Sequence, residues 1–266
     1  MNQDRVKDIL LKLHDFKVDF VVIFSGKKNK KINGLYKIDK NEIIIHNRNF
    51  INADGKLNKD MLLYTAIHEA AHHIQYTELK QKSARAHTSL FYATLDDLVD
   101  IAEKKGLYKM PVDEDTQKLI DEAKNISCEI AAMQRKLGKV LRKLHETCEK
   151  KGIRYDDVIE RKAQISRQTE KRAKKAHALN IPVEIGADIQ EAAVKERDEE
   201  KIAAIVHAGQ KGKSIDQAKK AVARPINQED DKISLLKEKI HLERTIDNLK
   251  RHLEEVVERL RSKGGE

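Results

Sequence analysis

The chain has 266 residues and a formal net charge of +9; 36% of its residues are charged, 4% are aromatic, and tryptophan is absent. This length allows two or three structural units, at least one of which can bury a core. The composition argues against one large compact enzyme and favours long, solvated helices. The excess of positive charge favours a polyanionic partner such as nucleic acid.

The cysteine content and the hydropathy indicate the compartment. Cys128 and Cys148 are the two cysteines, and they lie far apart on one expected helix, so a reducing environment is predicted. No apolar run approaches the roughly 20 residues that cross a bilayer, and residues 1–16 alternate charge with leucine, unlike a signal sequence. We therefore expect a cytoplasmic protein that makes no membrane contact.

In the first part of the chain, the pattern of apolar residues changes from one typical of a helix to one typical of strands. Residues 3–16 predict an amphipathic helix because their apolar side chains recur at helical spacing. Residues 18–25, 32–38 and 41–47 are rich in β-branched and aromatic residues and are separated by turn-forming segments. They predict three short, mostly antiparallel strands.

Two helices are expected next. The first covers about 59–78, with Asn58 as its N-cap, and the second covers about 88–105 and stops at Gly106. Residues 1–108 are therefore expected to form a compact α+β domain.

The remainder of the sequence predicts only helices. A long connecting helix is expected within residues 112–152, a pair of short helices within 153–181, further short helices within 182–224 and a coiled coil within 228–262. The coiled coil is indicated by apolar residues spaced alternately by four and three, and it could pair with a second copy of the chain or fold back on the long helix. Its seam consists of Leu242, Ile246, Leu249, Leu253, Val256 and Leu260.

The segment HEAAH, His68 to His72, carries the strongest chemical signal. Positions four apart on a helix lie one above the other, so His68 and His72 can bind a single ion. Glu69 is displaced by about 100° around the axis, where it can take a proton from a water on that ion. This is the H-E-x-x-H arrangement of zinc hydrolases. The alternative is a helix that carries histidines without a common role.

A catalytic zinc ion needs a third protein ligand and an open fourth position. His73 follows His72 directly and turns away by about 100°, so a surface position or a supporting role is predicted for it. His87 opens the next helix on its inward face and is the preferred third ligand; a helix-start histidine without a special role is the alternative. The candidates considered are His73, Glu78, His87, Asp96 and Asp97.

This order of elements, with HEAAH on one helix and AHTSLFYATLDDL opening the next, resembles the SprT-like and related minimal gluzincin-type metallopeptidases over about residues 1–108. The resemblance implies a zincin-like α+β fold, followed here by an all-α region. It also implies zinc bound by His68, His72 and His87, Glu69 as the catalytic base, and a protein or peptide substrate.

The resemblance also suggests where a peptide would bind, and this sequence differs from the family at two points. In such folds a strand edge beside the cleft can bind an extended peptide, and NEIIIHN, residues 41–47, is the candidate edge, with a buried strand of the sheet as the alternative. Thr88 stands where the family often has glycine, and the zinc ribbon common in the family is absent.

A basic helical pair follows the long helix. Residues 150–180 contain ten Lys and Arg against four Asp and Glu, and Ser166 can cap the second helix of a helix-turn-helix. The pattern resembles bacterial and phage DNA-binding modules, and the alternative is a solvated basic hairpin. The residues expected to contact DNA are Arg167, Gln168, Lys171, Arg172 and Lys175.

Taken together, the two signatures predict a zinc metallopeptidase that acts on a protein at DNA, forms a homodimer through its coiled coil and comes from a phage or another mobile element. The alternative is a DNA-binding or partition-type regulatory protein whose zinc site is structural or vestigial.

Overall fold

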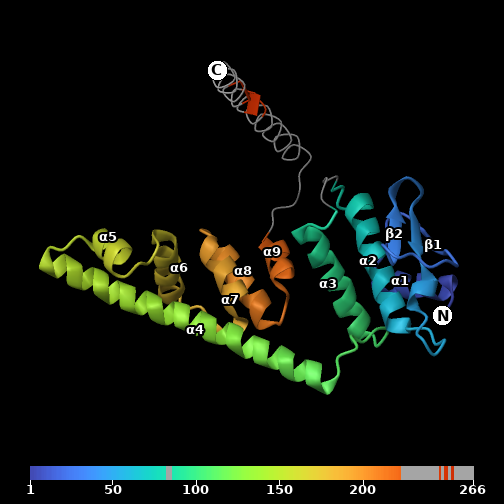
Figure 1. Cartoon of the computed structure of the whole chain (residues 1–266), viewed down its shortest axis with the longest axis horizontal. Coiled ribbons are helices and arrows are strands. Elements are labelled where there is room, and N and C mark those ends of the chain that lie inside the picture. Colours follow the sequence, from blue (N-terminus) through green and yellow to red (C-terminus); the bar gives the residue numbers. More distant parts are fainter. Residues whose placement is uncertain (82–85, 223–245, 247–248, 251–252, 255–266) are drawn as a thin grey trace, which may run out of the picture. The chain divides into compact units, whose positions relative to one another are not determined.

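The computed structural model describes residues 1–81 and 86–222, together with residues 246, 249, 250, 253 and 254. Within these residues the fold is mixed α+β and mostly helical, with one three-stranded sheet (Figure 1). Met1–Val222 forms one unit and Ala223–Glu266 another. The predicted coiled coil at 228–262 lies outside the described residues except at five positions. No described helix is long and apolar enough to span a bilayer.

The chain begins with α1, Gln3–Leu13, which ends three residues before the predicted boundary. The side chain of Asn2 accepts a hydrogen bond from the backbone N–H of Arg5, so one of the unpaired donors at the helix start is satisfied. The predicted apolar face is buried. It consists of Val6, Ile9, Leu10 and Leu13.

The sheet contains β1 (Val21–Phe24), β2 (Gly34–Lys37) and β3 (Glu42–Ile45) in the spatial order β1-β3-β2. The strand β3 runs antiparallel to β2 and parallel to β1, so the prediction of mostly antiparallel strands holds for one of the two pairings. A tight turn at Asn41, which adopts a left-handed conformation, folds β3 back between the other two strands.

This topology corrects the predicted peptide-binding edge. The segment 41–47 contains β3, the central strand, whose main-chain groups pair on both sides and whose Ile43 and Ile45 are fully buried. The alternative, a buried strand, is therefore right. The edge strand beside α2 is β2.

The two expected helices are confirmed as α2, Lys59–Thr77, and α3, Ser89–Lys104. Asn58 caps α2 by accepting from the N–H of Met61, and Thr88 caps α3 by accepting from the N–H of Phe91. α2 packs against the sheet and α3, and one continuous hydrophobic core extends from Val6 to Tyr108.

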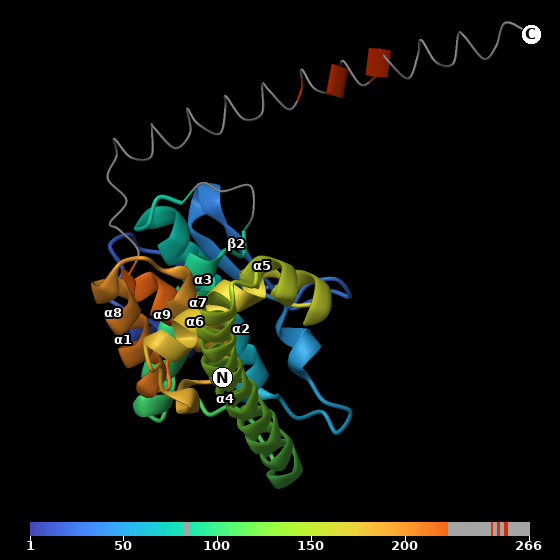
Figure 2. The same cartoon turned by 90° about the vertical axis from the view of Figure 1, so that its left-hand side faces the viewer.

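The long helix is α4, Glu114–Lys151, which ends where Gly152 adopts a left-handed conformation. α5 (Tyr155–Asp157) continues into a π-helical turn (Val158–Lys162), and α6 (Arg167–Ala178) is capped by Ser166 as predicted. α6 lies along α4 (Figures 1 and 2).

Three further helices complete the first unit: α7 (Ala187–Lys195), α8 (Glu199–Gln210) and α9 (Ile215–Val222). α7 packs on α4 and α8, and α9 returns to α3. In that contact Lys220 pairs with Asp97 at 2.8 Å. The helical region is thus joined to the first 108 residues at both of its ends.

Candidate metal centre

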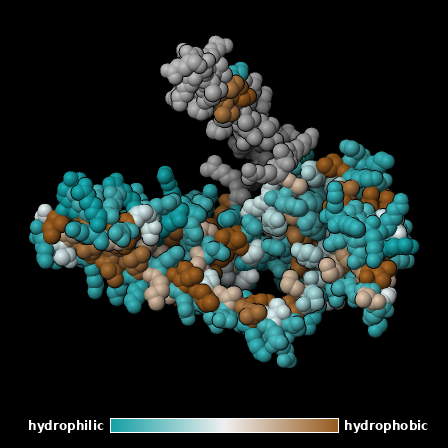
Figure 3. Space-filling model, viewed as in Figure 1, coloured by the Kyte–Doolittle hydropathy of each residue, from teal (hydrophilic) through white to brown (hydrophobic). Residues whose placement is uncertain are grey.

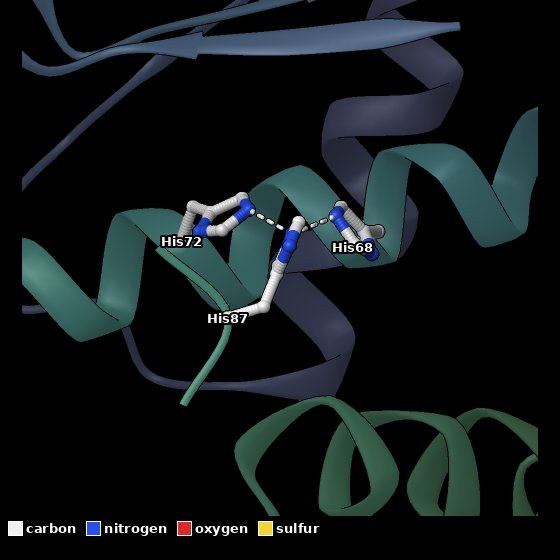
Figure 4. A group of neighbouring side chains, drawn as sticks. All are labelled: His68, His72 and His87. Carbon is white, nitrogen blue, oxygen red and sulfur yellow. Dashed lines mark hydrogen bonds between the residues drawn. The ribbon is translucent and has the colours of Figure 1, made fainter. Parts of the chain in front are cut away.

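Three histidine side chains converge beside the sheet (Figure 4). His68 and His72 project from α2 one turn apart, and His87 comes from the segment that leads into α3. The Nε2 atom of His87 lies 3.1 Å from Nε2 of His68 and 3.2 Å from Nε2 of His72. The structure therefore brings together the three predicted ligands in a group that could hold a metal ion.

The spacing and protonation of this group suit a transition metal. Four-coordinate zinc with bonds of roughly 2.0–2.1 Å holds neighbouring ligand atoms about 3.3 Å apart, close to the two Nε2 distances. Burial, together with the charges of His72 and His87, lowers the pKa of His68 to about 4, and burial also lowers the pKa of His72. Both rings are therefore neutral near pH 7, the state that ligates metals. Imidazole donors suit zinc, copper, iron and nickel.

Two residues that the sequence reasoning missed orient the ligands. Nδ1 of His72 lies 3.1 Å from Oε1 of Gln75, so the ring donates there and leaves Nε2 free for an ion. The amide of Gln75 also donates to the carbonyl oxygen of Ala86, which fixes the backbone next to His87. The fully buried ring of Phe91 stacks on His72 at 4.2 Å. Gln75 follows His72 by three residues on one helix, a spacing that places two side chains next to each other, so this hydrogen bond could have been predicted from the sequence.

Glu69 lies on the same helix, and its side chain is almost fully buried. A Cβ atom at Gly34 would come within 2.8 Å of the Glu69 Oε1 atom, so only glycine lets β2 approach this closely. Burial raises the pKa of Glu69 to about 7, although the backbone N–H of Tyr36 donates to the carboxylate and opposes the shift. A carboxyl group with this pKa can exchange a proton near neutral pH.

A cleft of about 660 Å³ opens onto this group of residues. One wall is the edge strand β2, and the other walls come from α2 and from the segment after α3. The lining is mostly apolar and includes Leu35, Tyr36, Tyr64, Tyr76, Tyr108 and Met110. His68 is half-buried and His87 is exposed, so the ligand cluster has an open side.

His73 faces away from the cluster, as predicted, but it does not lie at the surface. Its side chain is fully buried; Nδ1 lies 3.0 Å from the Tyr36 hydroxyl and Nε2 lies 2.8 Å from the carbonyl oxygen of Val18. The 100° turn after His72 indicated only that His73 points away from the ligands, and the structure shows that α1 and the sheet cover this side of α2. His73 is a core histidine with both nitrogens paired.

The other candidates for a third ligand have different partners. Glu78 lies 3.0 Å from Nε2 of His14. Asp96 accepts a hydrogen bond from Ser214, and Asp97 pairs with Lys220 in the contact between α3 and α9. His87 is therefore the candidate that the structure brings to His68 and His72.

The residues expected to contact DNA differ in their exposure. Arg167, Gln168 and Lys171 are exposed on α6, and Arg167 pairs with Glu160 at 2.5 Å. Arg172 is half-buried and pairs with Glu191 of α7 at 3.0 Å, and Lys175 donates to a backbone carbonyl oxygen. α6 also packs mainly on α4, whereas the second helix of a helix-turn-helix packs on the helix before it. The exposed basic surface is therefore smaller than expected.

Comparison with protein-family models, with curated proteins and with solved structures gives no match for this chain. The resemblance to SprT-like metallopeptidases therefore depends on the HEAAH spacing, the position of His87 and the order of elements.

Proposed function

We propose that the chain is a zinc-dependent metallopeptidase, with His68, His72 and His87 as ligands and Glu69 as the general base. One observation carries the proposal: a buried carboxyl group with a pKa of about 7 stands on the same helix as two of three converging imidazoles, beside an apolar cleft. Zinc, when bound, supplies a Lewis acid that polarises a substrate carbonyl and activates water near neutral pH.

The protein's own residues carry out the proton transfers in this proposal. Glu69 takes a proton from the attacking water and returns it to the leaving amine nitrogen. Its orientation is fixed by the N–H of Tyr36 and by the close approach of Gly34. An extended peptide chain suits the cleft because β2 is an edge strand and the walls are apolar.

Replacing Glu69 with Gln tests the mechanism. The amide cannot take a proton, so we expect hydrolysis of an unfolded protein substrate to fall by roughly 10²–10⁴-fold, while the bound zinc measured by elemental analysis stays constant. Glu78→Gln, which changes a carboxylate bonded to His14 outside the site, should leave hydrolysis unchanged. Full hydrolysis by Glu69→Gln would exclude Glu69 as the base.

The proposal includes a location at DNA. It is supported by the net charge of +9 and by the exposed Arg167, Gln168 and Lys171 of α6. Binding to a DNA duplex should weaken linearly with the logarithm of salt concentration. Arg167→Ala together with Lys171→Ala should reduce that slope by roughly 2 if both side chains contact phosphates. Arg172→Ala is the control because its side chain is only 38% exposed and is held by Glu191 of α7, whereas the side chain of Arg167 is 62% exposed. Equal slopes for all proteins would contradict this part of the proposal.

A second candidate is a DNA-binding or partition-type regulator with a structural or vestigial zinc site. It is favoured by the position of His87, since an ion there would join α2 to the segment that leads into α3. Under this alternative, chelation lowers the thermal stability and DNA binding, and the zinc-loaded protein cleaves no protein substrate. Cleavage by the zinc-loaded protein would decide for the peptidase.

A further inference from the structure

The long helix α4 has two apolar faces. Among the described residues, one face is covered by neighbouring helices, and most of the other is exposed, although its Leu137 and Leu144 are half-buried. The first face packs on α5, α6 and α7 through Ala131, Gly138, Leu141 and Cys148. The second lies about 100° further around the axis, and five of its side chains are between 47% and 66% exposed. These five are Leu119, Ile126, Ile130, Met133 and Val140. Figure 3 shows hydrophobic surface along this helix.

The second face has the spacing of a coiled-coil seam. From Leu119 to Leu144 an apolar residue recurs alternately after four and three positions without interruption, through about three and a half heptads. This seam spans about 38 Å at 1.5 Å per residue. In heptad letters the a positions are Ala123, Ile130, Leu137 and Leu144, and the d positions are Leu119, Ile126, Met133 and Val140.

The charges beside this seam are divided between the two halves of the helix. Each g position, one residue before an a position, carries a charged and exposed side chain. The first three are acidic and the last three are basic. They are Asp115, Glu122, Glu129, Lys136, Lys143 and Lys150. The e positions on the other flank carry no charge: Ile120, Ser127, Gln134, Leu141 and Cys148.

This division selects both the direction and the register of a partner helix. In a parallel pair g faces e, which here would leave every charge without a partner. In an antiparallel pair of identical helices g faces g, and the acidic half of one helix lies against the basic half of the other. Asp115 then faces Lys150 of the second copy, Glu122 faces Lys143, and Glu129 faces Lys136.

The apolar seam requires the same register independently of the charges. When those three charge pairs are aligned, every a residue meets a d residue of the second copy, as close packing of an antiparallel coiled coil needs. The four layers are Ile130 with Met133, Leu137 with Ile126, Ala123 with Val140, and Leu144 with Leu119.

We propose that two copies of this chain associate through α4 as an antiparallel pair, with the dyad between Glu129 and Lys136. The exposed d positions of the seam lie away from α6, whereas Leu137 and Leu144 are half-buried against the core that α4 forms with Ile159 and Ala173. The second copy would cover the part of these two leucines that remains exposed. This interface differs from the predicted dimer through residues 228–262, which lie largely outside the described part of the chain.

A charge exchange in the full chain tests the pairing. Sedimentation equilibrium at low ionic strength should give a dimer for the natural sequence. Glu122→Lys with Glu129→Lys, or Lys136→Glu with Lys143→Glu, sets like charges against each other and should raise the dimer dissociation constant at least tenfold. All four changes together restore opposite charges in every pair, so this variant should again form the dimer.

Two controls separate this interface from other modes of association. Asp121→Lys with Glu149→Lys makes the same change in net charge at f positions and should leave the dimer intact. Leu249→Glu with Leu253→Glu changes the C-terminal seam and should also leave it intact. A monomeric natural protein, a fourfold variant that stays dissociated, or a dimer that is lost only with Leu249 and Leu253 would each overturn the proposal.

Discussion

The two regions of Met1–Val222 are built from different side chains. The core of the first 108 residues contains large groups, among them Phe20, Phe91, Leu62 and Ile67, all nearly or fully buried. The helical region that follows buries aliphatic side chains and alanines, such as Leu141, Ile205, Ala173 and Ala193, and none of its described buried hydrophobic residues is aromatic. A thick core can hold polar groups away from water, whereas small residues such as Gly138 and Ala173 let α4 and α6 come close together.

The two regions also differ in where their polar and charged side chains lie. In the first region Glu69, His72, His73 and Gln75 are all buried, and each has a defined hydrogen-bond partner. Such fixed polar groups are what a metal site or a catalytic site requires. In the helical region the charged groups lie mostly at the surface, and within the described part of the chain α4 leaves most of an apolar stripe exposed. The proposed pairing of α4 and the proposed contact with DNA both use this exposed surface of the second region.

The largest effect is expected from His87→Ala. Removing a residue that hydrogen-bonds to a metal ligand typically lowers metal affinity by roughly 10–100-fold. Loss of one of the three ligands themselves should lower zinc affinity by more than this. The measurement is competition for zinc with a chelator of known affinity. His145→Ala is the matched control, because His145 lies on α4 and contacts Tyr155. Equal affinity for the two variants would show that His87 is not a ligand.

The contact between α4 and α6 should respond most to Gly138→Ala. An added Cβ would lie 2.0 Å from the backbone oxygen of Ala173, which cannot move without shifting α6. We expect a loss of about 3 kcal/mol in unfolding free energy, measured by denaturant titration, with zinc affinity retained. Lys139→Ala, on the exposed neighbouring residue, should change stability by less than about 0.5 kcal/mol. If Gly138→Ala also abolished zinc binding, the two regions would not be separable.

Burial of Glu69 should make the metal-free protein less stable as the pH rises. The pKa of its carboxyl group rises from 4.5 to about 7 on folding, so the folded state binds more protons between these values and stability falls across this window. The loss amounts to at most about 3 kcal/mol. Glu69→Gln in the presence of chelator should therefore raise stability at pH 8 relative to the natural protein and leave the difference near zero at pH 4.

Denaturant titrations at the two pH values measure this effect. The control is Glu78→Gln, whose carboxyl group interacts with His14 and should give no gain at pH 8. A Glu69→Gln protein that is no more stable than the natural protein at pH 8 would contradict the burial of a charged carboxylate. A gain would show that the site lowers the stability of the first region.

Local patterns in the sequence identified most of the helices and the converging ligands. Asn58 and Ser166 cap helices where short-range hydrogen bonding predicts it, and the four-residue spacing of His68 and His72 is a property of any helix. The strand order was not predictable in the same way, because β3 is placed by the contacts of both neighbours. The burial of His73 depends on α1 and Val18, and Gly34 contacts Glu69 across a long stretch of sequence. These contacts join residues that are far apart in the sequence, so no local pattern of residues indicates them.

The smallest effect is expected where the two regions meet at α3 and α9. Lys213 and Lys220 pair with Asp100 and Asp97 at 2.6 and 2.8 Å, but all four side chains are about one-third exposed. Lys213→Ala with Lys220→Ala should therefore cost only about 1 kcal/mol, and less at high salt. Hydrogen exchange of the α9 amides at low and high salt measures this local loss, and Arg142→Ala, which removes an exposed pair within α4, should not change it. Unchanged α9 protection at low salt would mean that the packing of Ala218 against the apolar side chains of α7 and α8, and not these ion pairs, holds α9 in place.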